Sequence, residues 1–131
     1  MATLTIDADG HVRDTDEGIR PFLEAPYNER PRLSAGAPRD GFDNTLGNRA
    51  GTRVVDTAVW VDALERGGLD FSVLYPTGSL GAGWIRESDF AEARSSAYNN
   101  WLHHTYMQAD SRFKGVAMLP IQNPVSAAKE L

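Results

Sequence analysis

The chain has 131 residues, of which 41% are hydrophobic and 24% charged, the proportions of a small globular domain and not of a disordered chain. Its formal net charge of −5 gives no reason to expect a nucleic acid as a partner, because binding to the phosphate backbone requires a basic surface. There is no cysteine, so disulfides and thiolate metal sites are excluded, and any metal must be held by oxygen and nitrogen.

Segments that would direct the chain to a membrane are not apparent in the sequence. No stretch approaches the roughly 20 apolar residues of a membrane-spanning helix. The N-terminal segment carries Asp7 and Asp9, whereas a signal peptide begins with basic residues and continues with an apolar run. We therefore expect a cytoplasmic protein with no membrane partner.

Residues 3–11 alternate between polar and apolar side chains, which is the period of a β-strand. Leu4, Ile6 and Ala8 form its apolar face. Residues 12–56 then form a long loop with no clear period and room for one short helical turn. Loops of this length are uncommon in compact domains and often have a function.

The next elements have clear boundaries. Asp56 or Thr57 caps a helix that ends at Gly67 and Gly68, because glycine commonly follows the last helical turn. Residues 71–75 are a short apolar run of strand length. A glycine-rich loop over 76–87 follows this strand.

A second helix is predicted to start at Asp89, with Glu92 three residues later as in a capping box. Its apolar residues form two adjoining stripes: Phe90, Ala93, Ala97 and Trp101, and beside them Tyr98, Leu102 and Tyr106. A stripe this wide suits a helix that packs on a sheet.

Residues 115–119 are predicted to form a third strand, and Asn123 followed by Pro124 starts a third helix. Strands that alternate with helices imply a parallel sheet. A sheet of three strands leaves both edges open, and the last helix is short. We therefore expect the chain to be a fragment of a larger fold, or else a homo-oligomer.

The sequence Asp7-Ala8-Asp9-Gly10-His11 carries the clearest candidate site. Alternate residues of a strand share one face, so Asp7, Asp9 and His11 are predicted to point the same way. Carboxylate and imidazole groups at this spacing can reach one divalent cation. The alternative interpretation is that these residues form a turn without a metal, since turns are rich in Asp and Gly. A calcium loop is excluded, because Val12 stands where that loop needs glycine.

Other candidates have simpler explanations. His103 is expected to be solvated, and His104 to pack beside the apolar stripe of the second helix. The loop at residues 78–83 has three glycines but not the pattern of a phosphate-binding loop. Residues 12–53 of the long loop carry seven arginines and seven acidic residues, so surface pairing is expected for most of them.

The stretch from Ile6 to Val12 resembles the first strand of the amidohydrolase-related metal-dependent enzymes, which include the aminocarboxymuconate-semialdehyde decarboxylase type. The resemblance continues at residues 68–77, 97–101 and 112–120, in the order that the family has. It covers the chain from residue 4 to the end.

This resemblance implies an α/β fold, a (β/α)₈ TIM barrel of which residues 1–131 are the N-terminal portion, with about three strand–helix units. It also implies one divalent metal, zinc or manganese, held in part by Asp9 and His11. Aspartate stands here where the family commonly has the first histidine of a His-x-His pair. The family draws two further ligands from later strands, and this chain lacks those strands.

The function implied by the resemblance is that of a metal-dependent hydrolase or non-oxidative decarboxylase with a small-molecule substrate. The chain by itself is expected to be inactive, and no catalytic residue is assigned. Tyr75, Thr77 and Trp84 are candidate substrate-binding residues, although each has an equally good packing explanation. The alternative function is that of a non-catalytic α/β module that associates with itself.

Overall fold

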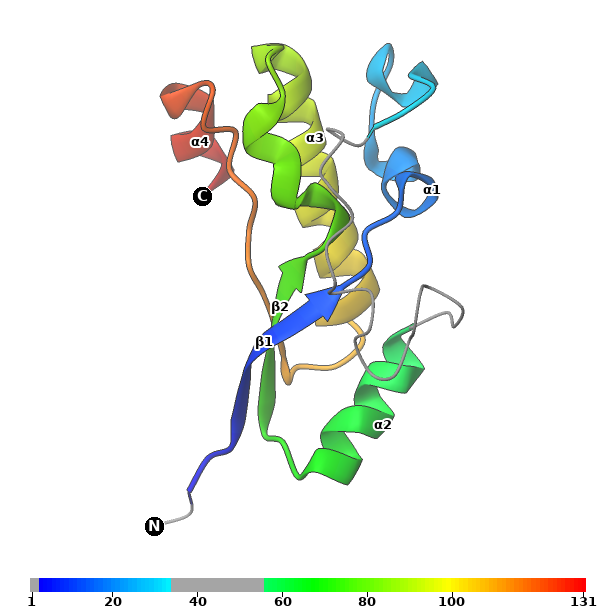
Figure 1. The fold of residues 1–131 in the computed structure, drawn as a ribbon, viewed down its shortest axis with the longest axis vertical. Helices are drawn as coiled ribbons and strands as arrows, with labels where there is room; N and C mark the ends of the chain where they lie inside the picture. The colour runs from blue at the N-terminus through cyan, green and yellow to red at the C-terminus, as the bar shows by residue number, and fades with distance from the viewer. Residues whose placement is uncertain (1–2, 34–55) are drawn as a thin grey trace. The chain divides into compact units, whose positions relative to one another are not determined.

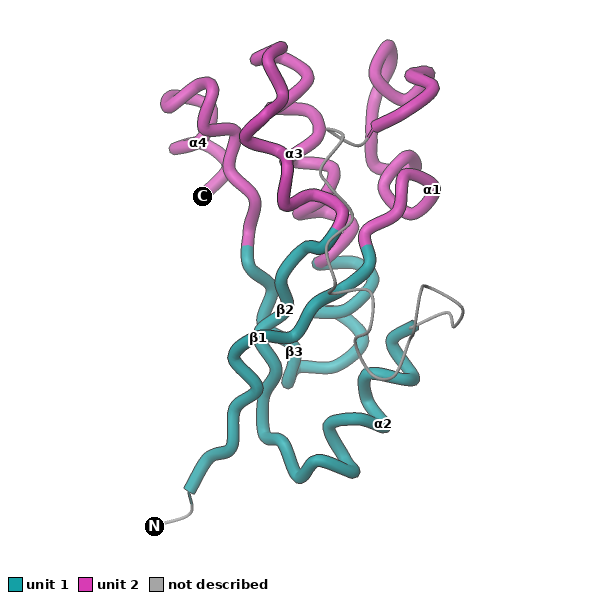
Figure 2. The backbone as a smooth tube through the Cα atoms, in the orientation of Figure 1, with its two compact units in different colours: residues 1–13, 40–77, 103–116 teal, residues 14–39, 78–102, 117–131 magenta. Residues whose placement is uncertain are grey.

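The computed structural model describes residues 3–33 and 56–131 (Figure 1). Residues 34–55 of the predicted loop, which include Arg39, Arg49 and Arg53, lie outside the described residues. The chain divides into two compact units (Figure 2). Unit 1 comprises residues 1–13, 40–77 and 103–116, and unit 2 comprises residues 14–39, 78–102 and 117–131.

Unit 1 contains a parallel sheet of three strands in the order β1-β2-β3. The strands are β1 (Ile6–Val12), β2 (Phe71–Pro76) and β3 (Phe113–Gly115). In β2, Ser72, Leu74 and Pro76 are buried, and the residues between them are half-buried. The predictions of an α/β fold and a parallel sheet are confirmed, and so is the strand over 71–75.

Helix α2 (Thr57–Gly67) starts and ends where the sequence predicts. The carboxylate of Asp56 accepts a hydrogen bond from the backbone N–H of Val59 at 3.0 Å, so Asp56 is the N-cap. Gly68 ends the helix with a φ of 59°, in the left-handed region that favours glycine. The ring of Trp60 meets Phe113 edge to face, with 6.5 Å between centroids.

Replacing Asp56 with alanine should destabilise the protein by about 1 kcal/mol, because the Val59 N–H loses its acceptor. Asp62→Ala is the matched control, since the pair of Asp62 with Arg66 is exposed. Such a pair contributes about 0.3–0.5 kcal/mol. Urea denaturation of both variants measures the difference, and equal shifts of the midpoint would show that Asp56 does not cap the helix.

The third strand starts two residues and ends four residues earlier than predicted, at 113–115 instead of 115–119. The side-chain amide of Asn99 explains the early end. Its Nδ2 donates to the carbonyl oxygen of Met118 at 2.9 Å, and its Oδ1 accepts from the Met118 N–H at 2.7 Å. Asn99 thus satisfies the backbone groups that a neighbouring strand would otherwise bind.

Unit 2 is helical. Among its described residues, the elements are α1 (Asp16–Ile19), α3 (Ser88–Leu102), α4 (Pro124–Glu130), and 3₁₀ stretches at Arg20–Phe22, Tyr27–Glu29 and Gly78–Trp84. The Asn123 side chain caps α4 by accepting from the N–H groups of Val125 and Ser126, at 3.1 and 3.3 Å. The predicted start of the third helix is therefore confirmed.

Helix α3 starts one residue before the predicted Asp89. The first helical hydrogen bond runs from the Ala91 N–H to the Glu87 carbonyl at 2.9 Å, so Asp89 already lies in the first turn. The predicted capping box of Asp89 with Glu92 is therefore wrong. The apolar stripe is confirmed at Phe90, Ala97 and Trp101, and the adjoining stripe at Tyr98, Leu102 and Tyr106, all of which are buried.

Unit 2 contains a buried ion pair that the sequence analysis does not predict. Arg94 is 2% exposed, and its Nη2 lies 3.7 Å from Oδ2 of the buried Asp14. Asp14 also accepts hydrogen bonds from the Gly78 N–H, at 2.7 Å, and from the Ser79 hydroxyl. Burial lowers the pKa of Arg94, and the negative charge of Asp14 partly opposes this effect.

The prediction that His104 packs beside the apolar stripe is wrong, because this residue is exposed. The chain after α3 continues as a π-helix, His103–Met107, in which the Gln108 N–H donates to the His103 carbonyl five residues earlier. The wider turn changes which side chains face inward. His103 is exposed as predicted.

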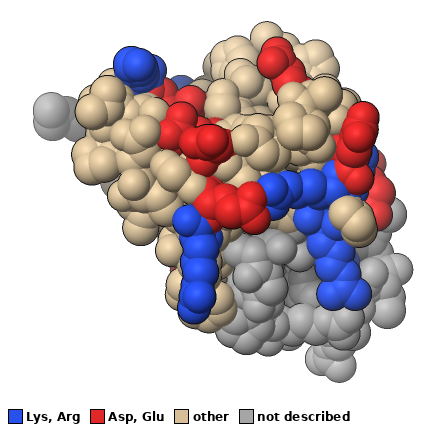
Figure 3. Space-filling model, turned by 90° about the horizontal axis from the view of Figure 1, so that it is seen from above, with Lys and Arg blue, Asp and Glu red and all other residues tan. Residues whose placement is uncertain are grey.

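Charged side chains of opposite sign are interspersed on the surface shown in Figure 3. Arg30 is one of the loop arginines within the described residues, and it pairs with Glu87 and stacks on the ring of Phe90, 4.0 Å from its centroid. Hydrogen bonds from Arg30 lower the pKa of Glu87. These contacts agree with the predicted surface pairing. Over the described ranges, no helix combines the length and the apolar character needed to cross a bilayer.

Candidate metal site

The candidate site lies at a β-bulge in the first strand. Asp7 is paired with Ser72 and Gly10 with Leu74, so β1 advances by three residues while β2 advances by two. Strand β1 therefore contains one extra residue between Asp7 and Gly10. Bulges of this kind re-aim the side chains that follow them.

The bulge changes which residues share a face of the sheet. Asp7 lies on the face of Ser72, whose hydroxyl donates to Asp7 Oδ2 at 2.7 Å. His11 is paired with Tyr75, which lies on the opposite face of β2. The prediction that Asp7, Asp9 and His11 share one face is therefore wrong. Asp7 instead holds the bulge, because its Oδ1 accepts from the Asp9 N–H at 3.1 Å.

Glycine is required at position 10 because three groups surround it. A Cβ atom there would lie 2.6 Å from the Ser72 hydroxyl, 2.9 Å from Asp7 Oδ2 and 3.1 Å from the ring of Trp60. Real Cβ atoms essentially never approach other heavy atoms as closely as the first two distances. Gly10 thus permits the bulge that precedes His11.

His11 is 8% exposed and is oriented by the end of the neighbouring strand. Its Nδ1 lies 3.0 Å from the carbonyl oxygen of Pro76. Because a carbonyl oxygen can only accept, Nδ1 carries the hydrogen of this bond. In the neutral ring, Nε2 then carries the lone pair with which a histidine binds a metal ion.

Asp9 lies beside that second nitrogen. Its Oδ1 is 3.5 Å from His11 Nε2, and its side chain is 79% exposed, so the pair opens to solvent. Two ligands about 2.1 Å from a tetrahedral metal ion lie about 3.4 Å apart. The separation of Asp9 and His11 therefore fits a shared metal ion. The same separation also fits an ion pair between Asp9 and a protonated His11.

Two of the three candidate substrate-binding residues lie next to His11. The ring centroid of Tyr75 is 6.0 Å from that of His11, and Thr77 Oγ1 is 3.4 Å from His11 Nδ1. Trp84 belongs to unit 2, where it ends the stretch Gly78–Trp84 and is 64% exposed. The substrate-binding role of these three residues stays a prediction.

The described residues contain no group of three or more His, Cys, Asp or Glu side chains close enough to hold a metal ion together. A metal ion bound by Asp9 and His11 would therefore have two protein ligands among the described residues. Catalytic metal sites usually have three protein ligands and one open position. Further ligands to this pair would come from water, from the substrate or from residues outside the described ranges.

Sequence reasoning missed two features of this site. The first is the Pro76 carbonyl, which orients His11 and leaves no trace in the side-chain pattern. The second is the bulge, for which a signal existed. A glycine inside a strand pattern commonly marks a bulge or a close approach of the backbone, and Gly10 does both.

Comparison with known proteins assigns no family to this chain. A scan of the sequence against models of protein families gave no match. A search of curated proteins also gave no match.

Proposed function

We propose that the chain contributes the first metal ligands, Asp9 and His11, to a metal-dependent hydrolase or non-oxidative decarboxylase. The metal is a divalent cation, zinc or manganese, and the enclosing fold is a (β/α)₈ barrel to which the parallel strands of unit 1 belong. The substrate is a small molecule. The resemblance of residues 6–12 to the amidohydrolase-related enzymes motivates this proposal.

The observation that carries the proposal is the orientation of His11. Its Nδ1–H donates to the Pro76 carbonyl, which leaves Nε2 facing Asp9 at 3.5 Å. Metal-binding histidines almost always donate their second ring N–H to a carbonyl or carboxylate in this way. The pair also lies at the carboxyl end of β1, the edge at which barrel enzymes place their sites.

The proposed site assigns separate roles to the metal ion, to its ligands and to the neighbouring side chains. When bound, the divalent cation supplies Lewis acidity toward water or a substrate oxygen. His11 and Asp9 hold it, with a neutral nitrogen and a carboxylate oxygen that suit zinc and manganese. Tyr75 and Thr77 lie beside His11, where they would contact the substrate. The choice between hydrolysis and decarboxylation depends on ligands and bases other than these residues.

Metal binding tests the proposal directly. Calorimetric titration of the chelator-treated chain with Zn²⁺ should show weak binding of one ion per chain, because the described residues offer two ligands at this position. His11→Ala should abolish this binding, since it removes half of the ligand pair. His103→Ala is the matched control, because His103 is exposed and not part of the pair. Unchanged binding in His11→Ala would contradict the proposal.

A second candidate function, self-association without catalysis, rests on exposed apolar residues of β1. Leu4 and Ile6 are 61% and 52% exposed, and Ile6 lies on a strand that pairs with only one other described strand. Exposed apolar edge strands commonly pair with another chain. If this function is correct, light scattering should show an oligomer that Ile6→Lys dissociates. A monomer at all concentrations would contradict it.

A further inference from the structure

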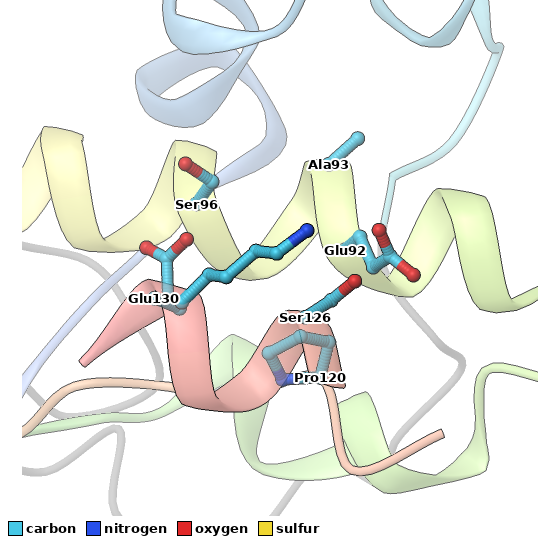
Figure 4. A pocket seen from close by; sticks show the side chains of 7 residues that line it. Glu92, Ala93, Ser96, Pro120, Ser126 and Glu130 are labelled. Carbon is cyan, nitrogen blue, oxygen red and sulfur yellow. The ribbon is translucent and has the colours of Figure 1, made fainter. Parts of the chain in front are cut away.

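Unit 2 contains a groove between α3 and α4, with a volume of about 350 Å³. Its lining residues are Glu92, Ala93, Ser96, Pro120, Ser126, Lys129 and Glu130. Figure 4 shows Glu92 at one end of the cavity and Glu130 with Ser96 at the other, with Ser126 and Pro120 between them.

The two carboxylates of this groove are held in place by amide groups. Asn123 Nδ2 donates to Glu92 Oε1 at 2.8 Å, and Asn99 Nδ2 donates to Glu130 Oε1, also at 2.8 Å. Each bond uses one carboxylate oxygen as acceptor. Both acids are therefore oriented before a ligand arrives, and this reduces the entropy that binding costs.

The charges of the groove define the ligand that would complement it. Glu92 and Glu130 supply two negative charges at opposite ends, and Lys129 supplies one positive charge. A complementary ligand has two cationic groups and one carboxylate. We propose that the groove between α3 and α4 binds a small basic amino acid of the lysine type.

The size and polarity of the groove agree with this class of ligand. A volume of about 350 Å³ lies at the lower end of the range for small-molecule sites, which is about 300–1,000 Å³. The hydroxyls of Ser96 and Ser126 add donors and acceptors along its length. Because charge pairs that remain open to water are weak, we expect a dissociation constant in the millimolar range.

Titration of the full chain with L-lysine, followed by the backbone amide signals of Ala93, Ser96 and Ser126, tests this proposal. Saturable shifts at these positions are expected. Cadaverine has the same two ammonium groups without the carboxylate, and 6-aminohexanoate has one ammonium group and the carboxylate. Both should bind roughly two- to fivefold more weakly than lysine. Cadaverine binding as tight as that of lysine would overturn the proposal.

Variants of the lining residues complete the test. Glu92→Gln and Glu130→Gln keep an oxygen acceptor for the asparagine amides but remove the charge, so the fold is retained. Each, like Lys129→Met, should weaken lysine binding by roughly two- to fivefold. Glu17→Gln is the control, because Glu17 is exposed and lies on α1. Equal weakening by Glu17→Gln, or no effect of the three groove variants, would overturn the proposal.

Discussion

Trp101→Ala is expected to destabilise the protein by about 3–5 kcal/mol, the usual cost of cutting a buried tryptophan to alanine. The Trp101 side chain is 7% exposed on the buried stripe of α3. Its ring packs against Tyr98, with 5.8 Å between centroids. The loss would take away much of the 5–15 kcal/mol that typically stabilises a domain.

The neighbours of Trp101 explain why the cavity would not refill. Tyr98 is itself fully buried, and the position of a Cβ at Gly18 would be 3.1 Å from Trp101 Nε1. Because Gly18 has no side chain that could move into the space, the cavity left by alanine persists. Collapse of the site would require the backbone of α1 to shift.

His103→Ala is the matched comparison for Trp101→Ala. His103 directly follows α3 but is exposed, and a surface change of this kind is usually within about 0.5 kcal/mol. Urea denaturation followed by circular dichroism measures both variants. Similar losses in the two variants would show that the buried face of this helix has been misidentified.

Arg94→Met is expected to cost about 3–5 kcal/mol, because it leaves the buried carboxylate of Asp14 without its counter-charge. Asp14 would keep its hydrogen bonds from the Gly78 N–H and the Ser79 hydroxyl. Those neutral donors cannot replace a positive charge in a site that excludes water. The substitution also removes the hydrogen bond that Arg94 Nε donates to the Leu33 carbonyl, at 3.3 Å.

A double variant separates the lost charge pair from lost packing. Asp14→Asn keeps the size and one acceptor oxygen but removes the charge, so combining it with Arg94→Met should restore part of the stability. Arg66→Met is the surface control, because the pair of Arg66 with Asp62 is exposed and is worth about 0.3–0.5 kcal/mol. If Arg94→Met is no more destabilising than Arg66→Met, Arg94 and Asp14 do not form a buried pair.

The features that the sequence predicts correctly depend on neighbours in the chain. Asp56 caps α2, Gly68 ends it and Asn123 caps α4, each through contacts within a few residues. The strand over 71–75 is apolar and lies between a glycine-ended helix and a proline. The alternation of strands and helices then requires parallel pairing.

The features that the sequence does not predict depend on contacts between distant residues. Asn99 binds the backbone of Met118 and so ends the third strand early. Arg94 is buried because Asp14, 80 positions earlier in the chain, compensates its charge. Periodicity treats arginine as a surface residue, because it takes no account of a partner that only the fold supplies.

The candidate site likewise has features that the sequence predicts and features that depend on distant residues. The proximity of Asp9 and His11 follows from their spacing and is confirmed by the 3.5 Å between Oδ1 and Nε2. The exclusion of Asp7 follows from the bulge, and the orientation of His11 follows from the Pro76 carbonyl. Both depend on the pairing of β1 with β2, which spacing along one strand does not describe.

The most direct test of the proposed metal pair is the ¹⁵N NMR spectrum of the His11 ring, recorded with and without Zn²⁺. We predict that Nδ1 carries the proton and that Zn²⁺ shifts the signal of Nε2, because the Pro76 carbonyl holds the Nδ1–H and leaves Nε2 beside Asp9. A ring protonated on both nitrogens, with signals that Zn²⁺ does not change, would contradict the account. In that case, Asp9 and His11 would be an ion pair and not the beginning of a metal site.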